Sequence, residues 1–166
     1  MKTLKEAYEE ACKGINIKEN EEIILKSKDI FYCIDFAKDI PEADIQTIEK
    51  IILESKSPEY SYEFVFQVPK ANIKAHEKVI LESKDIHYCY YFALGIHGAN
   101  RKAHEQVILE SKHPGYCYSF AIQINGSNKE ELFKVILESG NKFWINRFLE
   151  DVEFDKEKFK NYLLFI

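Results

Sequence analysis

The sequence contains few residues that interrupt helices and no stretch long enough to span a membrane. Its 166 residues include only six glycines and four prolines, so we expect no long disordered linker. The longest largely apolar run, residues 86–96, is far shorter than the roughly 20 residues that cross a bilayer. No positively charged start precedes an apolar segment, so we expect no secretion signal, a cytoplasmic location and no membrane partner.

An excess of basic charge and paired cysteines are also missing. The formal net charge is −5 at pH 7, whereas a dedicated nucleic-acid binder usually carries a basic stripe. None of the four cysteines forms a C-x-x-C pair suited to zinc. Cys33, Cys89 and Cys117 are separated by multiples of 28 residues. We expect them to be small core residues, because equivalent positions on packed helices lie roughly 9–10 Å apart, beyond disulfide reach.

Familiar catalytic motifs are absent as well. The sequence has no G-x-G-x-x-G, P-loop, G-x-S-x-G or H-E-x-x-H motif. We therefore expect a protein that is not an enzyme, with no cofactor, metal or catalytic residue. His76 and His104 are 28 residues apart, and we expect them to be inward-facing packing residues. The alternatives are a metal pair, which lacks acidic or thiol partners at defined spacing, and a Cys–His nucleophile using Cys89 or Cys117.

What the sequence does contain is a unit of 28 residues that repeats without a gap. Ile51, Val79, Val107 and Val135 mark equivalent positions, and an Ile-Leu-Glu-Ser block coincides at residues 52–55, 80–83, 108–111 and 136–139. A fixed period of this size is typical of stacked-repeat architectures. We predict an all-α protein, an α-solenoid of helix–turn–helix repeats with a 28-residue period.

The repeat predicts a single α-helical domain, residues 1–166, with these parts: half-repeat 1–22, repeats at 23–50, 51–78, 79–106, 107–134 and 135–162, and a terminal segment 163–166. In the half-repeat, Tyr8 is placed in the column of Phe64 and Phe92. We expect the phenylalanines of this column to face the core. The apolar end at residues 165–166 is expected to be tucked under the last helix or covered by a partner.

Each unit is predicted to form two helices, which we call helix A (29–40 and equivalents) and helix B (44–56 and equivalents). Each helix is preceded by a column of residues suited to capping its first amides. For helix A the column is Asp29, Ser57, Asp85, His113 and Asn141, and for helix B it is Asn16, Asp44, Asn72, Asn100 and Asn128. Asn16 with Glu19, and Asn128 with Glu131, have capping-box spacing.

A second apolar stripe on helix A allows two interpretations. Its members are the i, i+4 pairs Tyr62 and Phe66, Tyr90 and Leu94, and Tyr118 and Ile122. The stripe either packs between repeats, which we favour because terminal repeats are polar there, or forms an exposed aromatic ladder for a partner.

Recognition of a partner is expected where the repeat varies most. The first such column is Asp35, Glu63, Tyr91 and Ser119 on helix A. The second region is the turn between the helices, with Lys70, Lys74, His97, Arg101 and Lys102, to which Lys129 adds a further charge. A basic edge of this kind either keeps the protein soluble or contacts an acidic protein surface or a phosphate backbone. His97 and Arg101 could cluster with His104 and make a contact pH-dependent.

The combined pattern Tyr-Cys-Tyr-x-Phe-Ala, Gly-Ala-Asn and Glu-x-Val-Ile-Leu-Glu-Ser, found at residues 88–93, 98–100 and 105–111, resembles short α-helical repeat proteins of phages and mobile elements. The resemblance covers nearly all of the chain and is specific for fold only. Some proteins of this kind are similar to anti-CRISPR inhibitors of RNA-guided nucleases of the Cas13a type. The resemblance implies a small protein that docks on a nuclease effector complex, and it implies no catalytic residues.

Two functions follow as hypotheses. The first is a non-catalytic protein-binding module, a phage-type inhibitor that docks on a host RNA-guided nuclease and blocks it. The alternative is an RNA-binding α-solenoid, in which Tyr62, Tyr90 and Tyr118 stack on bases and the Lys70–Lys129 edge contacts phosphates.

Overall fold

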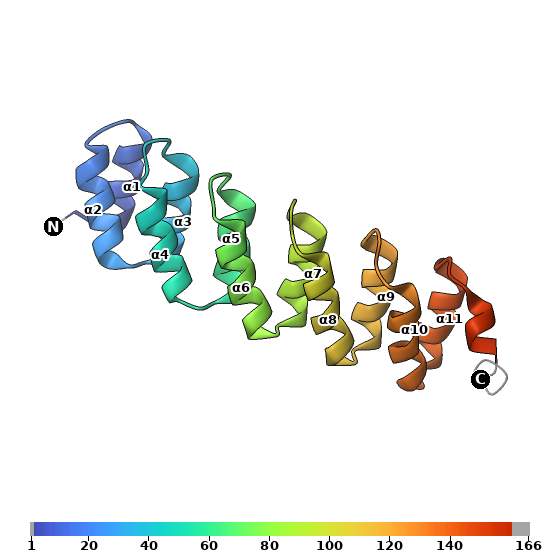
Figure 1. Cartoon of the computed structure of the whole chain (residues 1–166). Helices are drawn as coiled ribbons and strands as arrows, with labels where there is room; N and C mark the ends of the chain where they lie inside the picture. The colour runs from blue at the N-terminus through green and yellow to red at the C-terminus, as the bar shows by residue number, and fades with distance from the viewer. Residues whose placement is uncertain (1, 161–166) are drawn as a thin grey trace. The chain divides into compact units, whose positions relative to one another are not determined.

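The structure is a computed structural model that describes residues 2–160, and the predicted terminal segment 163–166 lies outside them. The described part of the chain contains eleven α-helices and one 3-10 helix, with no strand. Figure 1 shows the helices following one another through short turns. The prediction of an all-α protein is therefore confirmed. No helix between residues 2 and 160 is both long and apolar enough to cross a membrane.

The chain divides into two compact units, Met1–Ser83 and Lys84–Ile166. The helices of the first unit are α1 (Leu4–Cys12), α2 (Ile17–Ser27), α3 (Ile30–Asp39), α4 (Ile45–Glu54), α5 (Pro58–Gln67) and α6 (Ile73–Ser83). Those of the second are α7 (Ile86–Gly95), α8 (Arg101–Ser111), α9 (Pro114–Gln123), α10 (Lys129–Glu138), α11 (Lys142–Asp151) and η1 (Lys156–Phe159). Odd-numbered helices are the predicted A helices, and even-numbered ones are the B helices. That the chain forms a single domain stays a prediction.

The predicted caps of the A helices are confirmed. Each cap side chain accepts a hydrogen bond from a backbone amide in the first turn: Asp29, Ser57, Asp85, His113 and Asn141. His113 does so through Nδ1, 3.3 Å from the Tyr116 amide nitrogen. These bonds satisfy amides that have no partner inside the helix, which fixes where each helix begins.

The caps of the B helices are confirmed with one exception. Asp44, Asn72, Asn100 and Asn128 accept the expected amide hydrogen bonds. Asn16 is left-handed, with φ of 48°, and its side chain makes no cap bond, so its predicted capping role is wrong. Residues that cap a helix usually have extended dihedrals, and the left-handed backbone of Asn16 departs from that geometry. The reciprocal capping box occurs instead at Thr3 and Glu6, at the start of α1.

The recurrent Ile-Leu-Glu-Ser block has a clear structural purpose. Its isoleucines, Ile52, Ile80, Ile108 and Ile136, are completely buried, as is the equivalent Ile24. The serine hydroxyls that follow donate to the carbonyl oxygens of these isoleucines at 2.6–2.7 Å. The next residue is left-handed each time, at Lys28, Lys56, Lys84, Lys112 and Gly140. The block therefore supplies the core contact, ends helix B and reverses the chain into the next helix A.

Each unit has its own core, centred on the A-helix phenylalanines. Phe36 and Phe64 are completely buried in the first unit, and Phe120 and Phe148 in the second. The cysteines predicted to be small core residues, Cys33, Cys89 and Cys117, are completely buried and form no disulfide. Both predictions are confirmed.

The predicted alignment of α1 with the other A helices is wrong by two residues. The α2 cap, Asn16, comes thirteen residues after the α1 cap, Thr3, whereas Asp44 comes fifteen residues after Asp29. Because the first turn is two residues shorter, Tyr8 does not share the column of Phe36. It takes the place of Tyr90 and Tyr118, and Ala7 and Ala11 are the buried residues of α1.

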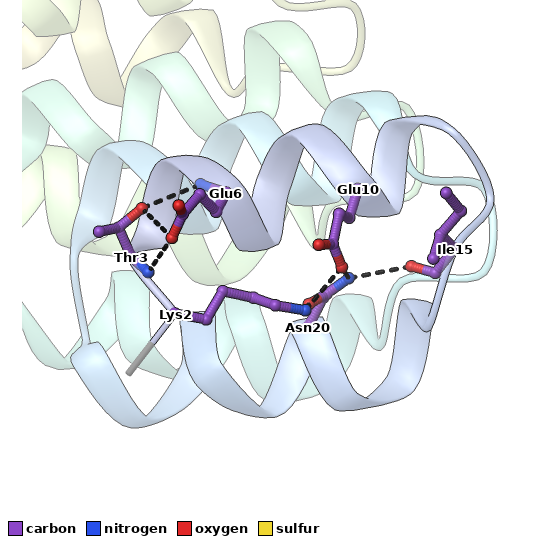
Figure 2. A network of polar contacts seen from close by, with 6 residues as sticks. All are labelled: Lys2, Thr3, Glu6, Glu10, Ile15 and Asn20. Atoms are coloured by element: carbon purple, nitrogen blue, oxygen red, sulfur yellow. Dashed lines mark hydrogen bonds and ion pairs between the residues drawn. The ribbon is translucent and has the colours of Figure 1, made fainter.

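A polar network joins α1 and α2. Lys2 Nζ donates to Glu10 Oε2 at 2.6 Å and to Asn20 Oδ1 at 2.8 Å, and Asn20 Nδ2 donates to the Ile15 carbonyl at 2.9 Å. Figure 2 shows these side chains converging beside the Thr3–Glu6 capping box. Asn20 is completely buried, so its hydrogen bonds offset the cost of placing an amide where Leu132 stands in a later unit.

Candidate protein-binding surface

Large apolar side chains are exposed mainly on the A helices. Six of the seven exposed large hydrophobic residues in the described chain lie there: Phe31, Phe66, Tyr91, Leu94, Ile122 and Phe143, with Ile15 as the seventh. They occupy the second, sixth and ninth positions after the cap, a spacing that places them on one face of a helix. This face of the individual A helices is called here the outer A face, and its members within the second unit form the candidate site.

In the second unit the outer A face lies over a continuous set of aromatic contacts. His87 contacts Tyr91 edge-to-face at 4.6 Å between ring centroids, and its Nδ1 lies 3.1 Å from the Tyr116 hydroxyl. Tyr90 contacts both Tyr91 and Tyr116, at 5.2 and 5.7 Å. Such contacts favour particular orientations of the exposed rings.

In the second apolar stripe, the two residues of each i, i+4 pair have different environments, so each of the two interpretations holds for one of them. Tyr90 is only 7 % exposed, and Tyr62 and Tyr118 are half-buried, so the tyrosines pack between helices. The residues four positions later, Phe66, Leu94 and Ile122, are exposed. The sequence could not show which residue of each pair packs and which is exposed, because packing depends on the position of the neighbouring helix.

The variable column on helix A lies at the edge of the outer A face. Tyr91 is exposed, whereas Asp35, Glu63 and Ser119 are half-buried. Asp35 lines a cavity between α1 and α3.

The basic turn residues are divided between the units. Lys70 and Lys74 are exposed in the first unit, and His97, Arg101 and Lys102 in the second. Arg101 Nε donates to the Ala93 carbonyl oxygen at 3.2 Å, so this guanidinium is turned back toward α7. His104 is completely buried, and therefore does not share the exposed surface of His97.

The histidine column is buried, as expected for packing residues. His76 is completely buried, with its ring 5.1 Å from Phe64 and its Nε2 3.3 Å from Glu49 Oε1, without hydrogen-bond alignment. Burial lowers the pKa of His76, and the Glu49 carboxylate opposes that shift. His104 has the same relation to Phe92, at 5.3 Å. Within residues 2–160 no group of three or more His, Cys, Asp or Glu side chains could hold a metal ion.

The buried cysteines are poorly suited to nucleophilic chemistry. Burial raises the pKa of the Cys89 and Cys117 thiols to about 12, and that of Cys33 to about 11. A thiolate, the reactive form, is therefore strongly disfavoured at neutral pH.

Three residues of the outer A face were missed by the sequence reasoning: Phe31, His87 and Phe143. They precede the variable column by four residues, about one helical turn, and this i−4 spacing was the available signal. No protein-family model, curated protein or solved structure matches this chain.

Proposed function

We propose that the chain is an α-solenoid of 28-residue repeats that binds a protein partner through the outer A face and has no catalytic activity. The observation that carries this proposal is the concentration of exposed large apolar residues on the A helices. Exposed apolar side chains that gather on one face mark interaction sites, whereas scattered ones do not. In the second unit, Tyr91, Leu94, Ile122 and Phe143 supply aromatic and aliphatic anchors of the kind that dominate binding energies.

The partner that the sequence resemblance suggests is a host RNA-guided nuclease, which this chain would block by occupying its surface. The net charge of −5 supports approach to a basic, nucleic-acid-handling protein. A cytoplasmic location is part of the same proposal.

The test uses a purified RNA-guided nuclease with its guide. We expect saturable binding of the chain and loss of target-RNA cleavage at stoichiometric amounts. The double variant Tyr91→Ser/Leu94→Ser should weaken binding at least about tenfold, because it removes anchors from the outer A face. The matched control Gln106→Ser/Lys134→Ser changes exposed residues of α8 and α10 and should leave affinity unchanged. Equal affinity of both double variants would refute the site.

An RNA-binding solenoid remains the second candidate, supported by the exposed Lys70, Lys74 and Lys102. Burial of Tyr90 leaves its ring without a free face for base stacking, which weakens this candidate. A gel shift with single-stranded RNA at low salt decides the question, since phosphate contacts are strongest there.

A further inference from the structure

The first unit contains a cavity of about 420 Å³ between α1 and α3, lined by Lys5, Tyr8, Glu9, Phe31, Tyr32 and Asp35. Its volume lies in the range of small-ligand sites. Half of the lining residues are aromatic.

The aromatic walls are held in place from several sides. Tyr8 and Tyr32 meet edge-to-face at 6.1 Å, and Phe31 meets Tyr60 of α5 at 5.7 Å. The Tyr8 hydroxyl donates to Asp39 Oδ2 at 2.5 Å. Phe31 is nevertheless 62 % exposed, so one of its faces is open to an incoming group.

The cavity carries one uncompensated charge. Lys5 and Glu9 pair with each other at 3.8 Å. Asp35, by contrast, has neither an ion pair nor a hydrogen bond to any residue between 2 and 160. A half-buried carboxylate beside aromatic faces attracts a cation, through the charge and through the ring quadrupoles together.

The second unit contains a corresponding junction, which can be compared with the α1–α3 cavity. At the junction of α9 and α11, Tyr118 donates to Asp151 at 2.6 Å, as Tyr8 donates to Asp39. Phe143 and Trp144 stand where Phe31 and Tyr32 stand, and Phe143 is 61 % exposed.

The residue in the Asp35 column of this junction is Arg147. Its guanidinium lies 5.8 Å from the Tyr118 ring centroid and 3.2 Å from Asp151 Oδ2. The second unit thus fills the position with its own arginine, whereas the first unit has a carboxylate there and no cation.

We propose that the α1–α3 cavity binds an arginine side chain of the protein partner, with the guanidinium against Phe31 and Tyr8 and paired with Asp35. A planar guanidinium stacks on rings and bonds a carboxylate through two N–H groups, which an ammonium cannot do. The choice of a protein side chain rests on the proposed function, but the cation chemistry does not.

The experiment needs no partner protein. Isotope-labelled chain is titrated with N-acetyl-arginine amide, its neutral analogue N-acetyl-citrulline amide, and choline, while NMR shifts are recorded. We expect the arginine probe to shift the resonances of Tyr8, Phe31 and Tyr32, with weak affinity that falls as salt is raised. Citrulline should bind at least about tenfold more weakly, because it lacks the charge.

Two variants and a control locate the site. Asp35→Asn should weaken arginine binding about tenfold, and Phe31→Ala about threefold to fivefold. Glu63→Gln removes the same charge from the same column on α5 and should change nothing. Phe31 is largely exposed, so its variant remains informative even if Asp35→Asn folds poorly.

Equal shifts with citrulline, tighter binding of choline, or unchanged affinity of Asp35→Asn would each overturn the assignment. The test of the proposed function changes residues of α7, whereas the test of the cavity changes residues of α3. Failure of one proposal can therefore be distinguished from failure of the other. Loss of the arginine response with retained nuclease binding refutes only the cavity.

Discussion

The junctions α1–α3 and α9–α11 share a tyrosine–aspartate hydrogen bond and an exposed phenylalanine, but they carry opposite charges at one equivalent position. Both have a tyrosine hydroxyl bonded to an aspartate of the next A helix and an exposed phenylalanine at its start. At the sixth position after the cap, however, one has Asp35 and the other Arg147. The fold therefore accommodates either charge at this position.

The position that directly follows Asp35 and Arg147 shows no such change and belongs to the core. Phe36 and Phe148, one position further along the same two helices, are both completely buried. The charged position therefore differs between the two helices while the adjacent phenylalanine does not, because the phenylalanine faces the core and the charged residue lies at the edge of the outer A face.

The largest expected effect comes from the scaffold position. Phe36→Ala and Phe148→Ala should each lower the free energy of unfolding by about 3–5 kcal/mol, since each leaves a cavity in a closed core. Urea denaturation followed by circular dichroism measures this loss. The exposed neighbours provide the control: Phe31→Ala and Phe143→Ala should change it by less than about 1 kcal/mol. Similar losses at buried and exposed positions would show that the outer A face is assigned to the wrong side.

A second comparison concerns two B helices, α6 and α10, where His76 and Leu132 share one column and both are completely buried. Because the folded-state pKa of His76 lies below its ordinary value of 6.5, the unfolded chain binds a proton that the folded chain excludes. The stability contributed by neutral His76 is therefore present above pH 6.5 and is lost as pH falls below it.

His76→Leu should remove this pH dependence. The parent should lose up to about 1.4 kcal/mol per pH unit below 6.5 relative to the variant. Denaturation at pH 7.5, 6.5 and 5.5 checks the difference in slope. Parallel curves for the two proteins would mean that His76 has the same pKa in the folded and unfolded chain, with the Glu49 carboxylate cancelling the effect of burial.

The sequence predicted the parts of this fold that depend on local chemistry. The A-helix caps, the buried phenylalanines and the buried cysteines follow from spacing and residue type alone, and all were found where expected. The register of Tyr8 was missed, because the 28-residue period was extended across a first turn that is two residues shorter; the Thr3–Glu6 capping-box spacing marks the true start of α1.

The candidate site was predictable only in part. Asp35 and Tyr91 were identified because their column varies, but Phe31 and Arg147 acquire their meaning from a neighbouring helix. The guanidinium of Arg147 reaches a ring 29 residues away in sequence, and such a contact depends on how α9 and α11 pack. Tertiary contacts of this kind cannot be derived from periodicity.

The smallest effect on stability is expected from exchanging the charges at positions 35 and 147, and this exchange tests the comparison of the two junctions directly. Asp35→Arg places in the first unit the residue that the second unit already has, beside the Tyr8 ring and Asp39. We expect the Tm to rise by about 1–3 °C, because an exposed guanidinium–ring contact and a new ion pair are gained. The same variant should no longer respond to N-acetyl-arginine amide, since its own side chain fills the cavity. Arg147→Asp is the reciprocal change and should lower the Tm, because two carboxylates then face one another at Asp151. A variant Asp35→Arg that still binds the probe would show that the two junctions are not equivalent.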